Sequence, residues 1–496
     1  MDIKKKLGCD VLVIGGGNAG LVAAIEAKNA GANVLLIEKG PKNSRGGNTR
    51  LSLAQFRIAS EGTNDYLPLL EGAKLPEGEL EIEPYPKDEF YNKLIELSEG
   101  FADKLLTEIY VERSLETVMW MKEQGVQWDI LPMNMKRVGN RLFFPAGQTA
   151  LMAAGGGESL VETLYGIAEK RGVEVLYQTA ARSPIQNADG KVCGIFGIGV
   201  NGLIQIDAKA VILACGGFQA DPEMRRRCLG ENWDLVRLRG TRYNTGDGIQ
   251  MALSIGAQLT GHWGGCHASI ICEATPMVEA AAGGSERYSY PYSIIVNRDG
   301  RRFIDEGEDF WDNTYAKLGK EILKQPGSVV FQVFDAKVIP LIGTEYQQDE
   351  TKVESKSLEQ IAEELDINIE NFLETIKEYN QSIVNDEKPF MTHKFDGRRT
   401  KGLKPDKTNW AQKIDTPPYR AYSAVCGLTM TYGGLKTNEK TQVINTCDHP
   451  IEGLYAVGEV TGGFFYHNYP GGTGLVRGAV MGRIAGAEAA TSITFH

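Results

Sequence analysis

Short apolar runs separated by small residues dominate the first forty residues of the chain. Val11 to Ile14 form the first apolar run, a glycine turn follows, and the stretch from Ala19 to Ala30 is rich in alanine. A second apolar run covers Val34 to Ile37. Runs of four apolar residues are typical of buried strands, and an alanine-rich stretch of this length is typical of a helix. The pattern predicts a strand–helix–strand unit and therefore a parallel sheet.

Further strands of this sheet are predicted far along the chain. The runs Val173 to Leu176 and Val211 to Leu213 lead into small residues, and a similar run comes only at Gly453 to Glu459. A sheet whose strands come from both ends of the chain has an insertion between them. Within that middle region Ser357 precedes Glu359 and an apolar series at helical spacing, which predicts a helix.

We therefore expect an α/β fold, with a doubly wound dinucleotide-binding domain and an inserted α+β capping domain. The expected bounds are residues 1–261 and 425–496 for the two parts of the first domain and residues 262–424 for the capping domain. A chain of 496 residues with 42% hydrophobic content is long enough to bury a core in both.

Charge and composition narrow the class of protein. The chain carries 53 Lys and Arg against 64 Asp and Glu, a net charge of −11, which argues against nucleic acid as its main partner. No window approaches the ~18 apolar residues of a membrane span. Gly15 cuts the first apolar run well short of a signal-peptide core. We expect a cytoplasmic protein without a membrane span.

The cysteines and histidines do not predict a metal site. None of the 8 cysteines forms a C-x-x-C pair, so a disulfide framework or an iron–sulfur signature is not expected. His262, Cys266, His267 and Cys272 lie close together, but their spacing matches no common zinc motif. We interpret them as a packed segment with one active histidine.

A glycine turn between the first strand and helix predicts a bound adenine dinucleotide. Gly15, Gly17 and Gly20 have G-x-G-x-x-G spacing, which lets backbone amides at a helix start approach a pyrophosphate. Glu38 ends the second strand, where a carboxylate accepts hydrogen bonds from a ribose diol. NAD and FAD share this fingerprint, so the choice between them comes from elsewhere.

Two distant stretches favour FAD. Val211 to Phe218 and Ile451 to Gly463 resemble the paired strand-end motifs of flavoproteins that bind FAD in an extended form. The sequence "PGGTGLVRGAVMGRIAG" then predicts a glycine loop that opens a final helix. The positive end of that helix would stabilise negative charge at N1 and O2 of a reduced flavin.

The motifs "SRGGNTRLS", "GCHAS", "VNRDGRRFIDE" and "YAVGEVTGGFFYHNYPGGTGLVRGAVMGRIAG", together with the glycine fingerprint, resemble the fumarate reductase and succinate dehydrogenase flavoprotein superfamily. Within it the nearest likeness is to FAD-dependent tricarballylate dehydrogenases, with 3-ketosteroid dehydrogenases as more distant relatives. The resemblance implies two-electron exchange between FAD and a carbon–carbon bond beside a carbonyl or carboxylate, under a capping domain. It implies a flavin site formed by Gly15, Gly17, Asn18, Ala19, Gly20, Glu38, Lys39, Gly46, Gly47, Asn48, Thr49, Gly155, Gly156, Ala180, Ala214, Gly216, Gly458, Glu459, Gly474 and Leu475.

The resemblance also assigns expected catalytic residues. Arg302 matches the arginine that handles the proton in fumarate reductases, and Glu286 falls where their relay glutamate lies. The arginine that accompanies this glutamate has no clear match, because direct counting reaches Ser289 and Arg287 requires a shift. His267 resembles a histidine that polarises a substrate carboxylate, the alternative being a core histidine.

Two departures from the superfamily affect the expected substrate. Thr429 and Tyr469 stand where fumarate reductases hold a carboxylate-binding histidine and a clamping arginine, so fumarate or succinate is an unexpected substrate. Tyr466, His467 and Tyr469 offer hydrogen bonds and proton transfer near the flavin instead. Tyr292 and Arg287 complete the expected substrate-binding residues.

We expect an FAD-dependent dehydrogenase or reductase acting on CH–CH bonds, with Arg302 or Tyr469 moving the proton as hydride passes to flavin N5. Tricarballylate oxidation to cis-aconitate is the leading hypothesis, since Arg302, Arg287, His267 and His467 could bind three carboxylates. A ketosteroid- or enone-type dehydrogenase or enoate reductase is the alternative, and a non-catalytic electron-transfer flavoprotein a second one.

The expected FAD is non-covalent, because no histidine precedes His262 at the place where succinate dehydrogenases attach their flavin. The electron partner is expected to be a quinone, a partner protein or oxygen.

Overall fold

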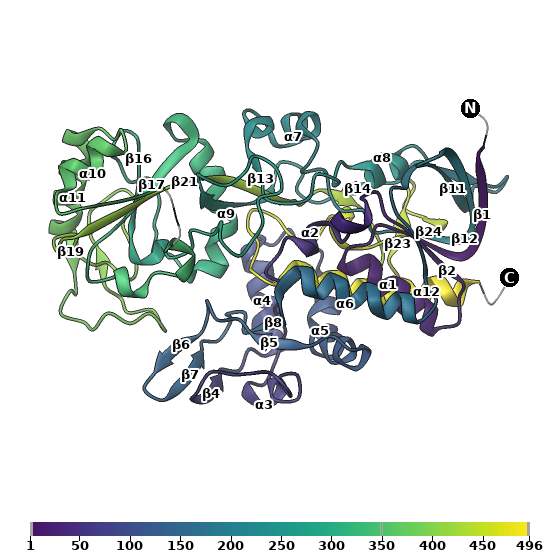
Figure 1. The fold of residues 1–496 in the computed structure, drawn as a ribbon, viewed down its shortest axis with the longest axis horizontal. Helices are drawn as coiled ribbons and strands as arrows, with labels where there is room; N and C mark the ends of the chain where they lie inside the picture. The colour runs from purple at the N-terminus through teal and green to yellow at the C-terminus, as the bar shows by residue number, and fades with distance from the viewer. Residues whose placement is uncertain (1–2, 348, 350, 494–496) are drawn as a thin grey trace.

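A computed structural model describes residues 3–347, 349 and 351–493 of the chain. Its largest sheet has eight strands in the order β10-β11-β12-β1-β2-β9, with β24 beside β12 and β23 beside β24. This sheet lies at the end of the elongated molecule where β1 begins (Figure 1). Its strands are β1 (Lys5–Ile14), β2 (Val34–Ile37), β9 (Glu174–Leu176), β10 (Ala180–Gln186), β11 (Val192–Gly199), β12 (Gly202–Leu213), β23 (Gln442–Ile444) and β24 (Pro450–Ala456).

The parallel core of this sheet confirms the predicted α/β fold. β1 pairs in parallel with β2 and β12, and β24, from the far end of the chain, pairs in parallel with β12. β1 begins six residues before the predicted Val11, because Lys5 to Cys9 pair with β12 as well. Helix α1 (Asn18–Asn29) follows the first strand, as its alanine-rich sequence predicts.

Helix α1 packs closely against the last helix, α12 (Thr473–Ser492). A Cβ atom at Gly482 would lie 2.6 Å from the carbonyl oxygen of Ala19, so glycine is required for this approach. Helices α5 (Lys104–Gln124) and α6 (Gly156–Lys170) lie on the same side of the sheet (Figure 1). The contact of α1 with α12 places the starts of both helices beside each other.

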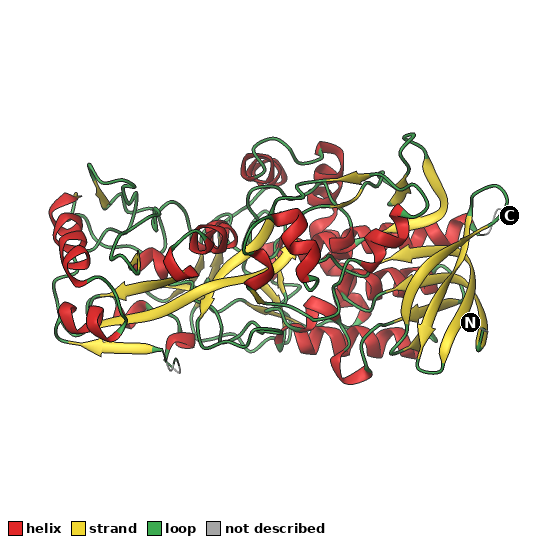
Figure 2. Ribbon diagram, turned by 90° about the horizontal axis from the view of Figure 1, so that it is seen from above, coloured by secondary structure: helices red, strands yellow, loops and turns green. Residues whose placement is uncertain are grey.

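The second large sheet has six strands around the long strand β21 (Tyr419–Thr431). It extends away from the first sheet toward the other end of the molecule (Figure 2). Its other strands are β13 (Arg237–Leu238), β15 (Cys266–Cys272), β16 (Ile294–Asn297), β17 (Val329–Phe334) and β18 (Lys352–Ser355), and its helices are α9 (Trp311–Leu323), α10 (Leu358–Glu364) and α11 (Ile369–Ser382). Ser357 caps α10 by accepting a hydrogen bond from the Gln360 amide, at the predicted helix start.

Two strands of this second sheet bear on the expected domain bounds. β13 precedes residue 262 and β21 crosses residue 424, yet both belong to the second sheet. The bounds of the capping domain stay a prediction.

A third group of elements lies beside α5, and the apolar pattern did not predict its short strands (Figure 1). The group contains β3 (Gln55–Phe56), β4 (Glu79–Ile82), β5 (Trp128–Ile130), β6 (Lys136–Val138), β7 (Arg141–Phe144), β8 (Leu151–Ala153), α3 (Thr63–Tyr66) and α4 (Lys87–Leu97). Helix α2 (Gly47–Arg50) packs against α6 instead. The remaining elements are α7 (Pro222–Leu229), α8 (Asp247–Leu253), β14 (Leu259–Thr260), β19 (Ile383–Val384), β20 (Arg399–Thr400) and β22 (Gly434–Leu435). Within the described residues, no helix has both the length and the apolar composition to cross a membrane.

A buried ion pair joins the three groups of elements. Arg57, just after β3, donates from Nη2 to Asp312 Oδ2 of α9 at 2.8 Å, and the two side chains are 2% and 0% exposed. Arg57 Nε also donates to the carbonyl oxygen of Gly471, in the loop before α12, at 2.8 Å. The amide of Gly471 returns to the carbonyl oxygen of Asp312 at 2.7 Å. This network fixes the loop before α12 against the first turn of α9.

We predict that Asp312→Ala destabilises the protein strongly, because Arg57 would keep its buried charge without a carboxylate partner. Breaking a buried pair typically costs about 3 to 5 kcal/mol, whereas an exposed pair contributes about 0 to 1 kcal/mol. Urea unfolding measures both. Glu308→Ala, which breaks the half-exposed pair with Lys317, is the matched control. Equal losses in the two variants would contradict the prediction.

Candidate active site

One large cavity lies where the parallel strands β1, β2 and β12 end. It encloses about 1540 Å³ of empty space, including its open mouth. One part is lined by the glycine turn after β1 and by residues of α1 and α12, and the other by aromatic residues on elements of the second sheet. The carboxyl ends of parallel strands are the usual place for a ligand in open α/β sheets. The cavity is therefore the candidate active site.

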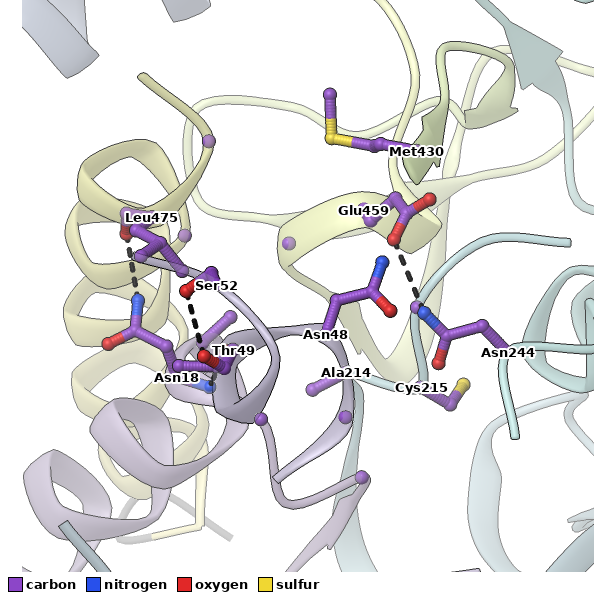
Figure 3. A pocket seen from close by; sticks show the side chains of 18 of the residues that line it. Asn18, Asn48, Thr49, Ser52, Ala214, Cys215, Asn244, Met430, Glu459 and Leu475 are labelled. Carbon is purple, nitrogen blue, oxygen red and sulfur yellow. Dashed lines mark hydrogen bonds between the residues drawn. The ribbon is translucent and has the colours of Figure 1, made fainter. Parts of the chain in front are cut away.

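The turn after β1 requires glycine. Gly15 has φ +107°, and a Cβ atom there would overlap the carbonyl oxygen of Ala214 at the end of β12. The turn delivers the chain into α1 at Asn18, whose amide donates to Thr49 Oγ1 at 3.1 Å. The Asn18 side-chain nitrogen donates to the carbonyl oxygen of Leu475 at 2.8 Å (Figure 3). Helix starts α1 and α12 are thus tied together at the cavity wall, and the glycine turn at the start of α1 suits a pyrophosphate.

Glu38 ends β2 at the same edge and is 6% exposed. Its carboxylate accepts hydrogen bonds from the amides of Gly16 at 3.0 Å and Gly40 at 2.8 Å. Burial raises the pKa of Glu38, and these amide hydrogen bonds oppose the rise. Lys39 turns aside to form an ion pair with Asp247 at 2.6 Å. A carboxylate held this way fits a ribose hydroxyl pair.

Most of the residues expected at the flavin line the cavity. They are Gly15, Gly17, Asn18, Ala19, Glu38, Lys39, Gly47, Asn48, Thr49, Ala180, Ala214, Gly216, Gly458, Glu459, Gly474 and Leu475. Four others lie behind this lining. Gly20 packs against Gly15 inside α1, Gly46 precedes α2 against Val161, and Gly155 and Gly156 begin α6. The roles of all these residues at the flavin stay predictions.

Glu459 is a partly buried carboxylic acid in the cavity wall. It accepts hydrogen bonds from the Thr431 amide at 2.9 Å, from Gln219 at 3.2 Å and from Asn244 at 3.4 Å (Figure 3). Burial raises the pKa of Glu459 to about 7, although these donors oppose the rise. Near neutral pH the group therefore both donates and accepts protons.

Aromatic rings line the far part of the cavity. Tyr288 and Trp311 stack with ring centroids 4.6 Å apart, and Tyr315 meets Tyr288 edge-on at 4.9 Å. His267 stacks on Tyr469 at 4.7 Å. Burial lowers the pKa of His267 well below its ordinary 6.5, with nearby Arg239 adding to the shift, so the ring is neutral. Among the described histidines only His267 lines the cavity.

Arg239 is the cation at this aromatic part. Its guanidinium donates to Glu286 at 3.1 Å and to Thr429 Oγ1 at 3.2 Å. Glu286 is held in turn by the amides of Gly283 and Gly284. The motif comparison located Glu286 but missed its arginine, because Arg239 precedes it by 47 residues. The short strand β13, paired with β21, brings Arg239 to the site, and no local pattern in the sequence signals it.

Arg302 does not reach the cavity. It forms a paired contact with Glu306, with Nη2 to Oε2 at 2.6 Å and Nε to Oε1 at 3.0 Å. Its Nη1 donates to the carbonyl oxygen of Pro405, its Nη2 donates also to that of Ile304, and its guanidinium lies over the Tyr379 ring. All three guanidinium nitrogens therefore donate hydrogen bonds inside the second sheet's domain.

Four other expected substrate-binding residues also lie outside the cavity lining. Arg287 is buried in an ion pair with Asp349. Tyr292 packs edge-on against Phe390 and Trp410. Tyr466 and His467 form an aromatic cluster with His262 and the exposed Phe101. The structure thus places His267, Thr429 and Tyr469 in the cavity lining, holds Glu286 behind it through Arg239, and leaves the others elsewhere.

Comparison with known proteins relates this cavity to flavoproteins. The profile of the FAD binding domain family matches residues 10–475. The chain is 29% identical to a "Probable fumarate reductase" of Shewanella frigidimarina over 488 residues, which cover 97% of this chain and 74% of that protein. It is 26% identical to the vinyl phenol reductase of Lactiplantibacillus plantarum over 532 residues, covering 99% and 98%.

A solved structure of a fumarate reductase is also similar to this chain in fold. The open conformation of a flavocytochrome c3 fumarate reductase matches the fold with a TM-score of 0.73 at 26% identity, over 99% of this chain and 79% of that one.

We predict that Glu459 makes the flavin-free protein less stable as pH rises. Between its ordinary pKa of 4.5 and about 7, the folded state keeps a proton that the unfolded chain has lost. Stability therefore falls through this window, by a term on the order of 3 kcal/mol. Urea unfolding of wild type and Glu459→Gln from pH 4 to 8 measures the term as their difference. The exposed Glu158→Gln is the control. Parallel pH profiles for wild type and Glu459→Gln would contradict the prediction.

Proposed function

The chain belongs to the FAD binding domain family, and on that premise we propose that it transfers two electrons to or from one C=C bond on a flat, ring-bearing substrate. The bond is conjugated to a single carboxylate or carbonyl group. The protein is an FAD-dependent oxidoreductase of the fumarate reductase superfamily, acting on CH–CH or C=C bonds. The proposed substrate class rests on the aromatic wall of the cavity, which is formed by Tyr288, Trp311 and Tyr315, and on the Arg239 cation beside it.

The charges at the site favour one anionic group over three. A tricarboxylate needs several cations, and three of those considered for it, Arg302, Arg287 and His467, lie outside the cavity lining. Of the cations that do line the cavity, Lys39 is paired with Asp247 and Arg477 lies on α12. Arg239 is the one at the aromatic part, and Glu286 already neutralises part of its charge. Tricarballylate is therefore less well supported than an enoate or enone, the alternative that the sequence analysis left open.

The aromatic rings favour a ring on the substrate. Tyr288, Trp311 and Tyr315 offer ring faces and edges, and stacked or edge-on aromatic pairs contribute about 0.5 to 1.5 kcal/mol beyond burial. The name of one relative, vinyl phenol reductase, agrees with a substrate that carries a C=C bond on an aromatic ring.

FAD, when bound, supplies the exchange of two electrons with the substrate carbon. The remaining steps belong to residues of this chain. Arg239 binds the carboxylate or carbonyl oxygen and polarises the conjugated bond. The rings around it exclude water and hold the substrate flat, so that both reacting carbons are positioned.

We assign proton transfer to the Tyr469 hydroxyl. Burial raises the pKa of Tyr469, so its hydroxyl keeps its proton at neutral pH. The Gly474 amide donates to that oxygen at 2.8 Å and fixes the side chain at the start of α12. In reduction the hydroxyl donates its proton to the substrate carbon, and in the reverse direction the phenolate oxygen accepts it. Of the two residues expected from the sequence, Tyr469 lines the cavity and Arg302 does not. The electron partner stays a prediction.

The proposed substrate class predicts which compounds reoxidise the reduced flavin. Protein photoreduced without oxygen is mixed with an aryl acrylate, a cyclic enone, fumarate or cis-aconitate, and the return of oxidised flavin absorbance is followed. We expect reoxidation by the aryl acrylate or the enone at least tenfold faster than by the dicarboxylate and the tricarboxylate. Fast reoxidation by cis-aconitate alone would overturn the proposal in favour of tricarballylate chemistry.

Substitutions at the two assigned residues are expected to have different kinetic effects. Arg239→Met removes a charged hydrogen bond to the substrate, so KM should rise about 10- to 100-fold. Tyr469→Phe removes the proton donor, so kcat should fall about 100-fold or more with little change in KM. Steady-state rates of flavin-loaded variants measure both, and Arg301→Met, at a half-exposed side chain on the protein surface, is the control. Unchanged turnover in Tyr469→Phe would remove Tyr469 from the role.

A further inference from the structure

Arg477 is a buried cation in the cavity wall without a carboxylate partner. Three cations line the cavity, and two of them are paired, Lys39 with Asp247 at 2.6 Å and Arg239 with Glu286 at 3.1 Å. Arg477 is 3% exposed, its Nε has no hydrogen-bond partner, and no carboxylate among the described residues lies within ion-pair distance of it. Its positive charge is therefore available to pair with an anionic ligand in the cavity.

The position of the guanidinium follows from the helix. Side chains on a helix tilt back toward its N-terminus, so Arg477 lies level with the first turn of α12, at Thr473. The guanidinium is 4.4 Å from the ring centroid of Phe464 and 5.1 Å from that of Phe465, and these rings hold it in place. Burial lowers the pKa of Arg477 to about 10, which leaves it fully charged at neutral pH.

The start of α12 adds to this positive charge. Gly472 precedes the helix and supplies no side-chain cap. The Thr473 amide donates to the Pro470 carbonyl oxygen at 3.4 Å and the Gly474 amide to the Tyr469 hydroxyl oxygen at 2.8 Å, so the helix contributes through its dipole. The dipole of a 20-residue helix also favours negative charge at this end. An unpaired buried cation beside a helix N-terminus is an anion-binding site whose desolvation cost, several kcal/mol, is relieved when the anion is present.

We propose that Arg477 binds the pyrimidine edge of the two-electron-reduced flavin and thereby raises the flavin's reduction potential. Other anions have their own places. The pyrophosphate is expected at the Gly15–Gly17 turn, where α1 starts, and a substrate carboxylate at Arg239. Negative charge at N1 and O2 of the flavin, formed only on reduction, is the anion that remains. The inference rests on FAD binding and is independent of the proposed substrate.

The test is the midpoint potential of the bound flavin, measured on flavin-loaded protein without substrate by dye-coupled anaerobic reduction. Arg477→Met should shift the reduction equilibrium at least tenfold toward oxidised flavin, which is about 30 mV for a two-electron couple. Arg477→Lys should keep most of the wild-type potential. The matched control is Arg483→Met, on the same helix but paired with Glu116 at the surface.

The dissociation constant of FAD separates the outcomes. We expect oxidised FAD to bind Arg477→Met nearly as tightly as wild type, because the anion forms on reduction. An unchanged potential would overturn the proposal. Equal weakening of oxidised and reduced FAD would overturn it as well and would assign the cation to the phosphates. Should Arg477→Met fail to fold, Arg477→Gln gives the same readout with a neutral side chain that is still polar.

Discussion

The ion pair between Arg57 and Asp312 holds the active site together, because each partner belongs to an element that carries other site residues. Asp312 lies in the first turn of α9, next to Trp311 and one turn before Tyr315. Arg57 donates a hydrogen bond to the Gly471 carbonyl oxygen, in the loop that leads from Tyr469 into α12. The aromatic wall and the proposed proton donor are therefore positioned by one buried contact. The cost of burying these charges is offset only while the elements stay together.

The three charged groups Arg239, Arg477 and Glu459 have different surroundings in the cavity. In the proposed function Arg239, paired with Glu286, binds a substrate oxygen, and the pair leaves no strong net charge when the substrate is absent. The unpaired Arg477 is suited to a charge that appears and disappears with the redox state of the flavin. The partly buried acid Glu459, with its pKa raised to about 7, changes protonation near neutral pH. These three environments explain how one cavity accommodates a cofactor and a substrate of different polarity.

Local patterns in the sequence were enough for the dinucleotide half of the site. The apolar runs at Val11 and Val34, with the glycine turn between them, predict β1, α1 and β2 because strand pairing and helix starts depend on neighbouring residues. The substrate half depends on contacts between distant residues. Arg239 meets Glu286 only because β13 pairs with β21, and no spacing rule contains that pairing.

Arg302 shows a different limit of prediction from sequence. Motif spacing favoured Arg302 for chemistry, whereas Glu306, four residues later, pairs with its guanidinium. Glu306 is visible in the sequence, but only the structure shows that both side chains are buried and paired.

The most direct test of the account is a crystal structure of the flavin-loaded protein with a bound aryl acrylate. The proposed function predicts that the carboxylate contacts Arg239, that the ring lies against Trp311 and Tyr315, and that the Tyr469 hydroxyl points at the C=C bond. A ligand whose carboxylate contacts Arg302 or Arg287, with Arg239 still paired only to Glu286, would contradict it.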